Sequence, residues 1–139
     1  MIEKNKLLEL NEKFWLENKD KFQFIHTGFF NGNHILFVGQ NPGQPWSDDM
    51  KKLVDDCNSL VDYTEMEQKY QNIIKNTKIT SFINNIAGED WVHISFTNLV
   101  KCPTLDNSQP TEEQVKYFEV ILQKQILLVN PNIPCFKNE

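Results

Sequence analysis

The chain has 139 residues, of which 40% are hydrophobic and 24% charged, and its formal net charge is −5 at pH 7. This composition is unlike that of a disordered chain and suits one folded domain over residues 1–139. The acidic balance argues against a broad nucleic-acid-binding surface, although a small local one remains compatible with it. All fourteen basic residues are lysines, so phosphate contacts would come from point charges, hydroxyls or backbone N–H groups.

The apolar runs and the cysteines argue against a membrane protein, a secreted protein and a disulfide-bonded or zinc-binding protein. No apolar run approaches the roughly 20 residues of a membrane span. Residues 1–14 also lack the apolar core of a signal peptide, so we expect a soluble cytoplasmic protein with no membrane partner. The cysteines are odd in number, widely spaced and without a Cys-x-x-Cys pair: Cys57, Cys102 and Cys135. This pattern argues against a disulfide framework and against a zinc site.

The first half of the chain predicts helices around one strand. The apolar side chains of residues 3–18 recur at helical spacing, with Leu7, Leu10 and Phe14 on one stripe and Leu8 and Trp15 beside it. A turn is predicted at 29–33. The run "ILFV" at 35–38 is bounded by turns and predicts a strand buried on both faces. Residues 47–87 predict two or three helices, starting at Ser47 with the last ending at Gly88.

The second half predicts strand, helix and strand. Residues 91–100 are β-branched and aromatic and predict a second strand, followed by a polar proline loop. Thr111 is expected to cap a helix that runs to about Val129, with acidic residues in its first turn. The segment "NPNIPCF" predicts the start of a third strand, interrupted by Pro134.

This alternation predicts an α/β fold with three αβα layers, in which a short parallel sheet is covered on both faces. Ligands of such sheets bind outside the carboxyl ends of the strands. The first strand ends in "GQNPGQ" and the second in "TNLVKCPT", so Asn41 and Asn98 should reach the same edge of the sheet. Glycine permits close backbone approach and proline fixes a turn. A carboxamide offers both a donor and an acceptor to a nucleobase.

Two segments, "VGQNPG" and "FTNLVKCPTLDNSQPTEEQ", resemble the uracil-DNA glycosylase superfamily. The first resembles its water-activating motif and the second resembles a segment of its iron–sulfur branch, which "QILLVNPNI" continues. The resemblance covers about residues 34–133, after an N-terminal helical segment at 1–33. It implies a uracil-DNA-glycosylase-like fold, base flipping and hydrolysis of the N-glycosidic bond of uracil or a related damaged base. Such a protein would act on single-stranded or uracil-containing DNA in base excision repair.

The resemblance also implies a role for each matching residue. Asn41 matches the residue that positions the catalytic water, and catalysis should be weaker than with Asp because an amide cannot accept a proton. Asn98 matches the Asn that reads the edge of uracil and separates it from cytosine. The walls of the base pocket would come from Gly39, Gln40, Pro42 and Gly43. The candidates for DNA contact are Lys101, Thr104, Asn107 and Ser108, the last of which stands where the family has Arg.

Other features depart from the family. Only Cys102 matches one of the four cysteines of the iron–sulfur branch, so we expect no cluster and no other cofactor or metal. The family continues beyond the position of Glu139 to further strands and a loop with a catalytic His, so we expect a truncated domain without its final strand or strands. The three histidines are expected at the opposite edge of the sheet, and Trp46 is a poor match for the stacking aromatic. We therefore expect uracil excision to be weak or absent.

Alternatives remain open beside the favoured enzyme: a non-catalytic nucleobase- or nucleic-acid-binding module, or a degenerate gene product, with the oligomeric state undetermined. Asn98 is nearly as compatible with a buried amide that closes backbone hydrogen bonds, and Lys101 with an ordinary surface lysine. Cys102 is best interpreted as a small buried hydrophobe. The run 47–56 predicts a solvated helix face. Core positions are expected for the aromatic residues Trp15, Trp91, Phe82 and Phe96.

Overall fold

The computed structural model describes residues 3–43, 48–74, 85 and 91–136. Its centre is a four-stranded sheet in the order β1-β3-β2-β4. The strands are β1 (Phe29–Phe30), β2 (Ile35–Gly39), β3 (Ile94–Asn98) and β4 (Ile133–Phe136). The helices are α1 (Lys4–Asn18), α2 (Asp48–Asp56), α3 (Leu60–Ile74) and α5 (Glu112–Val129), with short 3-10 turns η1 (Trp91–His93) and η2 (Leu105–Asn107).

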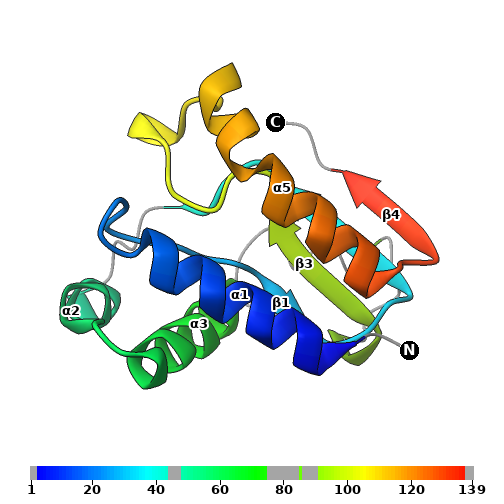
Figure 1. Ribbon diagram of the computed structural model, residues 1–139, viewed down its shortest axis with the longest axis horizontal. Helices are drawn as coiled ribbons and strands as arrows, with labels where there is room; N and C mark the ends of the chain where they lie inside the picture. The colour runs from blue at the N-terminus through cyan, green and yellow to red at the C-terminus, as the bar shows by residue number, and fades with distance from the viewer. Residues whose placement is uncertain (1–2, 44–47, 75–84, 86–90, 137–139) are drawn as a thin grey trace.

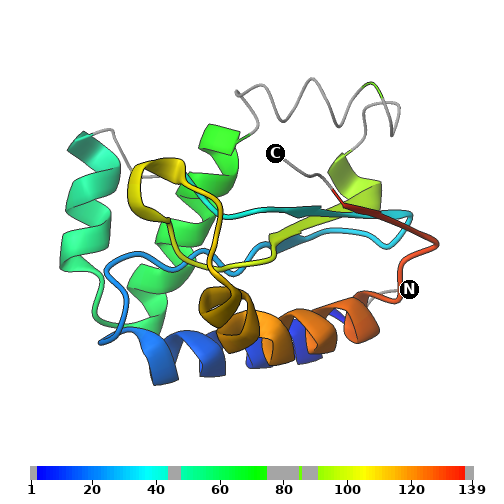
Figure 2. The ribbon, with the colours of Figure 1, turned by 90° about the horizontal axis from the view of Figure 1, so that it is seen from above.

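Helices α1 and α5 run side by side over one face of the sheet (Figure 1). Helix α3 crosses one end of the sheet with α2 beside it, as Figure 2 shows from above. The described part of the chain is therefore an α/β structure, in agreement with the predicted class. Among the described residues, no helix is both long and apolar enough to cross a membrane.

The sheet is mixed, which corrects the prediction of a wholly parallel one. Strands β2, β3 and β4 are parallel, but β1 pairs antiparallel with β3, with Phe29 opposite Phe96. Residues 29–33 were expected to form only a turn. The phenylalanines instead extend along β3, and Gly28 precedes them with a φ of 120°, a conformation open to glycine. A two-residue strand is too short to show an alternating pattern in the sequence.

Several predicted elements agree with the structure. Helix α5 has a capping box, in which Thr111 Oγ1 accepts from Gln114 N–H at 3.2 Å and Gln114 Oε1 accepts from Thr111 N–H at 2.9 Å. Strand β2 contains the predicted run 35–38. Strand β4 includes Pro134, and among the described strands it pairs with β2 alone, so the missing N–H of proline is tolerated on its other side. Strand β3 is shorter than predicted because η1 occupies its first residues.

Other predictions need correction or lie outside the described residues. Helix α1 has the predicted extent, but it buries Leu7, Asn11, Trp15 and Asn18, while 51% of Leu8 is exposed. Polar groups of Asn11 and Asn18 reach partners inside the protein, which apolar periodicity does not reveal. The predicted helix start at Ser47 and the helix ending at Gly88 lie outside the described residues, as do Phe82 and the side chain of Trp91.

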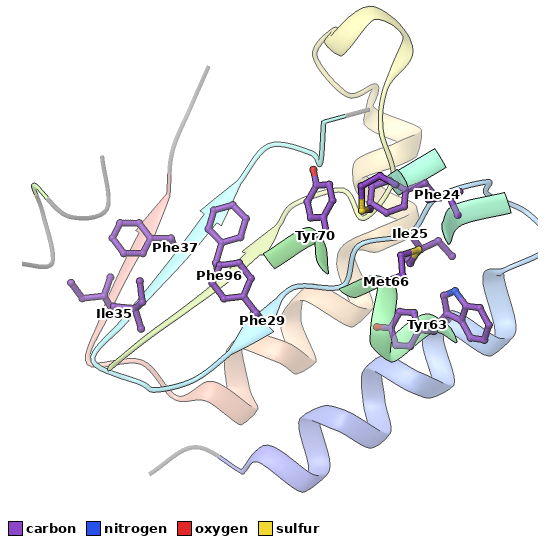
Figure 3. Packing of buried hydrophobic residues seen from close by; sticks show 13 residues of the cluster. Phe24, Ile25, Phe29, Ile35, Phe37, Tyr63, Met66, Tyr70 and Phe96 are labelled. Carbon is purple, nitrogen blue, oxygen red and sulfur yellow. The ribbon is translucent and has the colours of Figure 1, made fainter. Parts of the chain in front are cut away.

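Two clusters of apolar side chains lie on opposite faces of the sheet because side chains alternate along a strand. Toward α3 lie Phe29, Ile35, Phe37, Ile94 and Phe96, with Tyr63, Met66 and Tyr70 of that helix (Figure 3). Toward α1 and α5 lie Leu36 and Val38, with Leu7, Leu122 and Val129. A third cluster contains Cys102, which confirms its interpretation as a buried apolar side chain. Trp15 and Phe96 are core residues as predicted.

Candidate functional site at the carboxyl edge of the sheet

The ends of β2 and β3 lie against each other. Gly39 is opposite Asn98 in the parallel register. The pairing continues past the strands, because Leu99 N–H donates to Gly39 O at 2.8 Å and Val100 N–H donates to Gln40 O at 3.1 Å. Asn41 follows directly after this paired segment. The two sequence motifs are therefore neighbours at the carboxyl edge of the parallel strands.

The Asn98 carboxamide lies directly over Gly39. Asn98 is buried, and a Cβ placed on Gly39 would overlap its Oδ1 and would lie 3.3 Å from Phe96 Cζ. Among the described residues, none forms a hydrogen bond with the Asn98 carboxamide. The glycine thus makes room for the carboxamide beside the ring of Phe96, and this carboxamide can offer one donor and one acceptor.

The turn after β2 is attached to helix α3. Asn41 is partly buried, and its Nδ2 donates to Pro42 O at 3.1 Å. Gly43 N–H donates to Tyr70 Oη at 2.9 Å, and the same hydroxyl donates to Gly43 O at 3.4 Å. Burial raises the pKa of Tyr70 to about 12, so the hydroxyl keeps its proton at neutral pH. No local sequence pattern in residues 60–74 points to Gly43, so the sequence alone gives no signal for Tyr70 at this site.

Lys101 is fully buried, which corrects the expectation of a phosphate contact or a surface lysine. Its Nζ donates to Thr97 Oγ1 at 2.7 Å and to the backbone carbonyl of Asn98. Burial lowers the pKa of the Lys101 amine well below 10.5, against the opposing effect of the Glu67 charge. The reason for this placement is that the chain turns inward after Asn98, where Lys101 O accepts from His26 N–H at 2.8 Å.

The other expected DNA contacts differ in exposure. Thr104 is buried and its Oγ1 donates to Ser108 O at 2.6 Å, so its hydroxyl is used within the loop. Ser108 is exposed. Asn107 belongs to η2, and its side chain lies outside the described atoms, as does Trp46, the weak candidate for the stacking aromatic.

His26 lies at the carboxyl edge of β3, which corrects its expected position at the opposite edge. The reason is that β1 runs antiparallel to β3, so a residue before β1 meets the end of β3. His26 is completely buried, with Nδ1 2.8 Å from Glu67 Oε2. Its Nε2 is buried and has no hydrogen-bond partner among the described residues. His34 and His93 do lie at the amino edge, where His34 N–H donates to His93 O at 2.9 Å.

Two clefts lie away from the Asn41 and Asn98 segments. One, of about 770 Å³, is at the amino edge of the sheet and is lined in part by His34 and His93. The other, of about 340 Å³, opens between α1, β1 and α3, with Thr27 and Glu67 in its wall. Thr27 N–H donates to Glu67 Oε1 at 2.8 Å, and Nδ1 of His26 binds the other carboxylate oxygen, so this carboxylate already serves the fold.

The described residues contain no group of three His, Cys, Asp or Glu side chains placed to hold a metal ion. Cys57 and Cys102 are free thiols. Burial, together with the charges of Asp62 and Glu67, raises the pKa of Cys57 to about 11, and burial also raises the pKa of Cys102. Neither thiol is therefore tuned as a nucleophile, which requires a lowered pKa.

A comparison with models of protein families finds no match to this chain, and a comparison with curated proteins finds none either. What remains is the chemistry of the carboxyl edge. A buried carboxamide, an aromatic ring and a glycine lie together at the end of two parallel strands, next to a turn that is attached to α3. Such a set of groups suits a small planar ring with a donor–acceptor edge.

Proposed function

We propose that the chain is a uracil-DNA-glycosylase-like protein, which hydrolyses the N-glycosidic bond of uracil or a related damaged base in DNA at a low rate. The proposal rests on one observation above the others. The carboxamide of Asn98 is buried over Gly39, and no described residue forms a hydrogen bond with it. This amide also belongs to the segment that resembles the base-reading motif of the superfamily.

A carboxamide whose donor and acceptor are not used by the described residues is available to a ligand. It can form hydrogen bonds of about 1 kcal/mol each with a complementary ring edge. Uracil presents an N–H donor beside a carbonyl acceptor, and one carboxamide can pair with both. Cytosine presents the opposite polarity at one of these positions, so the same amide would discriminate against it.

Asn41 would act on the water that attacks the sugar. Its amide can orient a water molecule but cannot take up the released proton, and it carries no charge to stabilise a cationic sugar. In the proposed hydrolysis the C1′–N bond breaks with its electron pair on the departing base, water adds to C1′ of the oxocarbenium-like sugar, and the proton released from that water neutralises the base. Positioning of the water is the main contribution of Asn41. A low turnover number follows from this chemistry.

The second candidate is a binding module that holds a nucleobase without releasing it. Two observations favour it. Asn41 Nδ2 already donates to Pro42 O at 3.1 Å, which commits part of the amide to the turn. Lys101 and Thr104, which the resemblance offered for DNA contact, are both buried. A module of this kind would keep the carboxamide of Asn98 for base recognition and lack the chemical step.

The two candidates are separated by measuring uracil release and uracil binding on the same proteins. Release is followed on a single-stranded oligonucleotide with one uracil, and binding of free uracil by isothermal titration calorimetry. The variants are Asn41→Ala and Asn98→Ala. The matched control is Asn132→Ala, because Asn132 is exposed and its backbone joins Asn33 at the amino edge of the sheet.

We expect Asn98→Ala to weaken uracil binding by about tenfold or more, the value of one to two lost hydrogen bonds. We expect Asn41→Ala to lower release by about tenfold or more with binding nearly unchanged, and Asn132→Ala to change neither. Binding without release in the wild-type protein would favour the binding module. A wild-type protein that neither binds nor releases uracil would refute both candidates.

A further inference from the structure

Tyr70 joins helix α3 to the turn that carries Asn41. Its hydroxyl accepts a hydrogen bond from Gly43 N–H at 2.9 Å and donates to Gly43 O at 3.4 Å, so both backbone groups of one glycine meet one side chain. Figure 3 shows the Tyr70 hydroxyl turned toward the segment that follows β2. The contact links positions that are 27 residues apart in the chain.

The Tyr70 ring is itself held in place. Its centroid lies 5.0 Å from that of Phe24 and 4.5 Å from that of His26. His26 is fixed in turn by Glu67 at Nδ1 and by its backbone N–H, which donates to Lys101 O. The position of the Tyr70 hydroxyl is thus set by the same residues that lie beside the end of β3.

We propose that Tyr70 is a positioning residue for Asn41, an inference that rests on the proposed function. The turn of residues 39–43 is attached at its near end by the bonds from Leu99 and Val100, and at its far end by Tyr70. Asn41 lies between these attachments. Losing the far one leaves the amide tethered to the sheet on one side only.

The expected effect is on the chemical step. A reacting group displaced by about 1 Å can cost about 100-fold in rate, whereas the base is held by Asn98 on the other strand. Loss of the Tyr70 hydroxyl should therefore lower kcat and leave KM nearly unchanged. The raised pKa of Tyr70, about 12 because of burial, keeps the hydroxyl in its hydrogen-bonding form over the range in which activity is measured.

The variant Tyr70→Phe removes the hydroxyl and keeps the ring against Phe24 and His26. The matched control is Tyr63→Phe. Tyr63 lies two turns earlier on α3, is equally buried, and its hydroxyl bonds to Thr27 Oγ1, away from the turn. Three measurements are made on each protein: thermal unfolding, hydrogen exchange of the Gly43 amide by NMR, and kcat and KM for the uracil-containing oligonucleotide.

We expect Tyr70→Phe to speed exchange at Gly43 by about tenfold or more and to lower kcat by about tenfold or more, with KM within about twofold. Tyr63→Phe should leave the Gly43 exchange rate, kcat and KM within about twofold of the wild-type values, even if both variants melt at lower temperatures.

Equal effects of the two variants on kcat would overturn the inference in favour of a general loss of stability, as would an unchanged Gly43 exchange rate in Tyr70→Phe. A wild-type protein that releases uracil as fast as Tyr70→Phe leaves the proposed function standing and removes only the role of Tyr70. A wild-type protein that binds uracil without releasing it overturns the inference and supports the binding module. One that does neither overturns the proposed function as well.

Discussion

The buried amine of Lys101 predicts an unusual dependence of stability on pH. A neutral amine has two N–H groups, and the fold offers two acceptors, Thr97 Oγ1 at 2.7 Å and the carbonyl of Asn98. An ammonium has a third hydrogen, for which the described residues supply no acceptor. Burial lowers the pKa of this amine well below its ordinary value of 10.5, since charging it inside the protein is unfavourable.

The direction of the pH dependence follows from the number of protons that Lys101 binds in the folded and unfolded states. Between the lowered folded pKa and 10.5, the unfolded chain binds a proton at Lys101 that the folded chain does not bind, so the free energy of unfolding rises with pH. One proton gives at most about 1.4 kcal/mol per pH unit. Below the folded pKa both states bind the proton, and the slope disappears. The stabilisation of the neutral amine is thus present at high pH and is lost as the pH falls toward the folded pKa.

The perturbation is Lys101→Met, which keeps the length of the side chain and removes the titrating group. Urea unfolding of both proteins is measured at constant ionic strength from about pH 7 to pH 10. The stability of the wild-type protein minus that of the variant should increase with pH over this range. The raised pKa values of Cys57, Tyr63 and Tyr70 lower stability toward the alkaline end, but they are common to both proteins and cancel in the difference.

Lys124→Met is the control, because the Lys124 side chain is exposed on α5. The difference between the wild-type protein and this variant should not change with pH. A difference for Lys101→Met that is also constant from about pH 7 to pH 10 would refute the reasoning, since it would mean that Lys101 keeps its proton in the folded protein.

Two further predictions concern Gly39 and Cys57. Gly39→Ala places a Cβ where it overlaps Asn98 Oδ1, so the carboxamide must move, and we expect uracil affinity to fall by about tenfold in calorimetry; unchanged affinity would mean that the amide does not bind the base from its present position. The pKa of Cys57, raised from 9.0 to about 11, reduces its thiolate about 100-fold at neutral pH. Iodoacetamide should therefore alkylate Cys57 about 100-fold more slowly in the native protein than in urea, as followed by mass spectrometry. Equal rates would contradict the raised pKa of this thiol.

Elements with local signals were predictable from the sequence. The cap of α5 was predicted because Thr111 is followed by acidic residues, and the cap needs only groups within one turn. Strand β2 was predicted because a short apolar run between two turns is typical of a buried strand. The neighbourhood of Gly39 and Asn98 followed from the rule that parallel strands present their carboxyl ends at one edge. In each case the interactions that decide the structure either join residues close together in the sequence or occur in every sheet with parallel strands.

The position of His26 was not predictable in the same way. The edge of the sheet at which His26 lies depends on β1, which is too short to show an alternating apolar pattern. It also depends on the pairing of Phe29 with Phe96, which is distant in the sequence. Once this pairing is known, the rest follows: His26 lies beside Lys101, its ring lies against Tyr70, and Tyr70 reaches Gly43. One antiparallel pair therefore brings together residues that no local pattern connects.

Lys101 and Asn98 illustrate why the polar groups at the candidate site were the hardest to predict. Periodicity identifies side chains that leave water because they are apolar, whereas these two are buried because of what surrounds them. Lys101 is buried because Thr97 and a backbone carbonyl satisfy its amine, and its hydrogen bond to Asn98 O holds the peptide of the residue whose carboxamide lies over Gly39. The lysine that the sequence suggested for a phosphate contact is thus buried and binds the backbone of Asn98. The two amides would then be held from two directions, Asn98 by Lys101 and Asn41 by Tyr70, and each support can be removed by one substitution that spares the other.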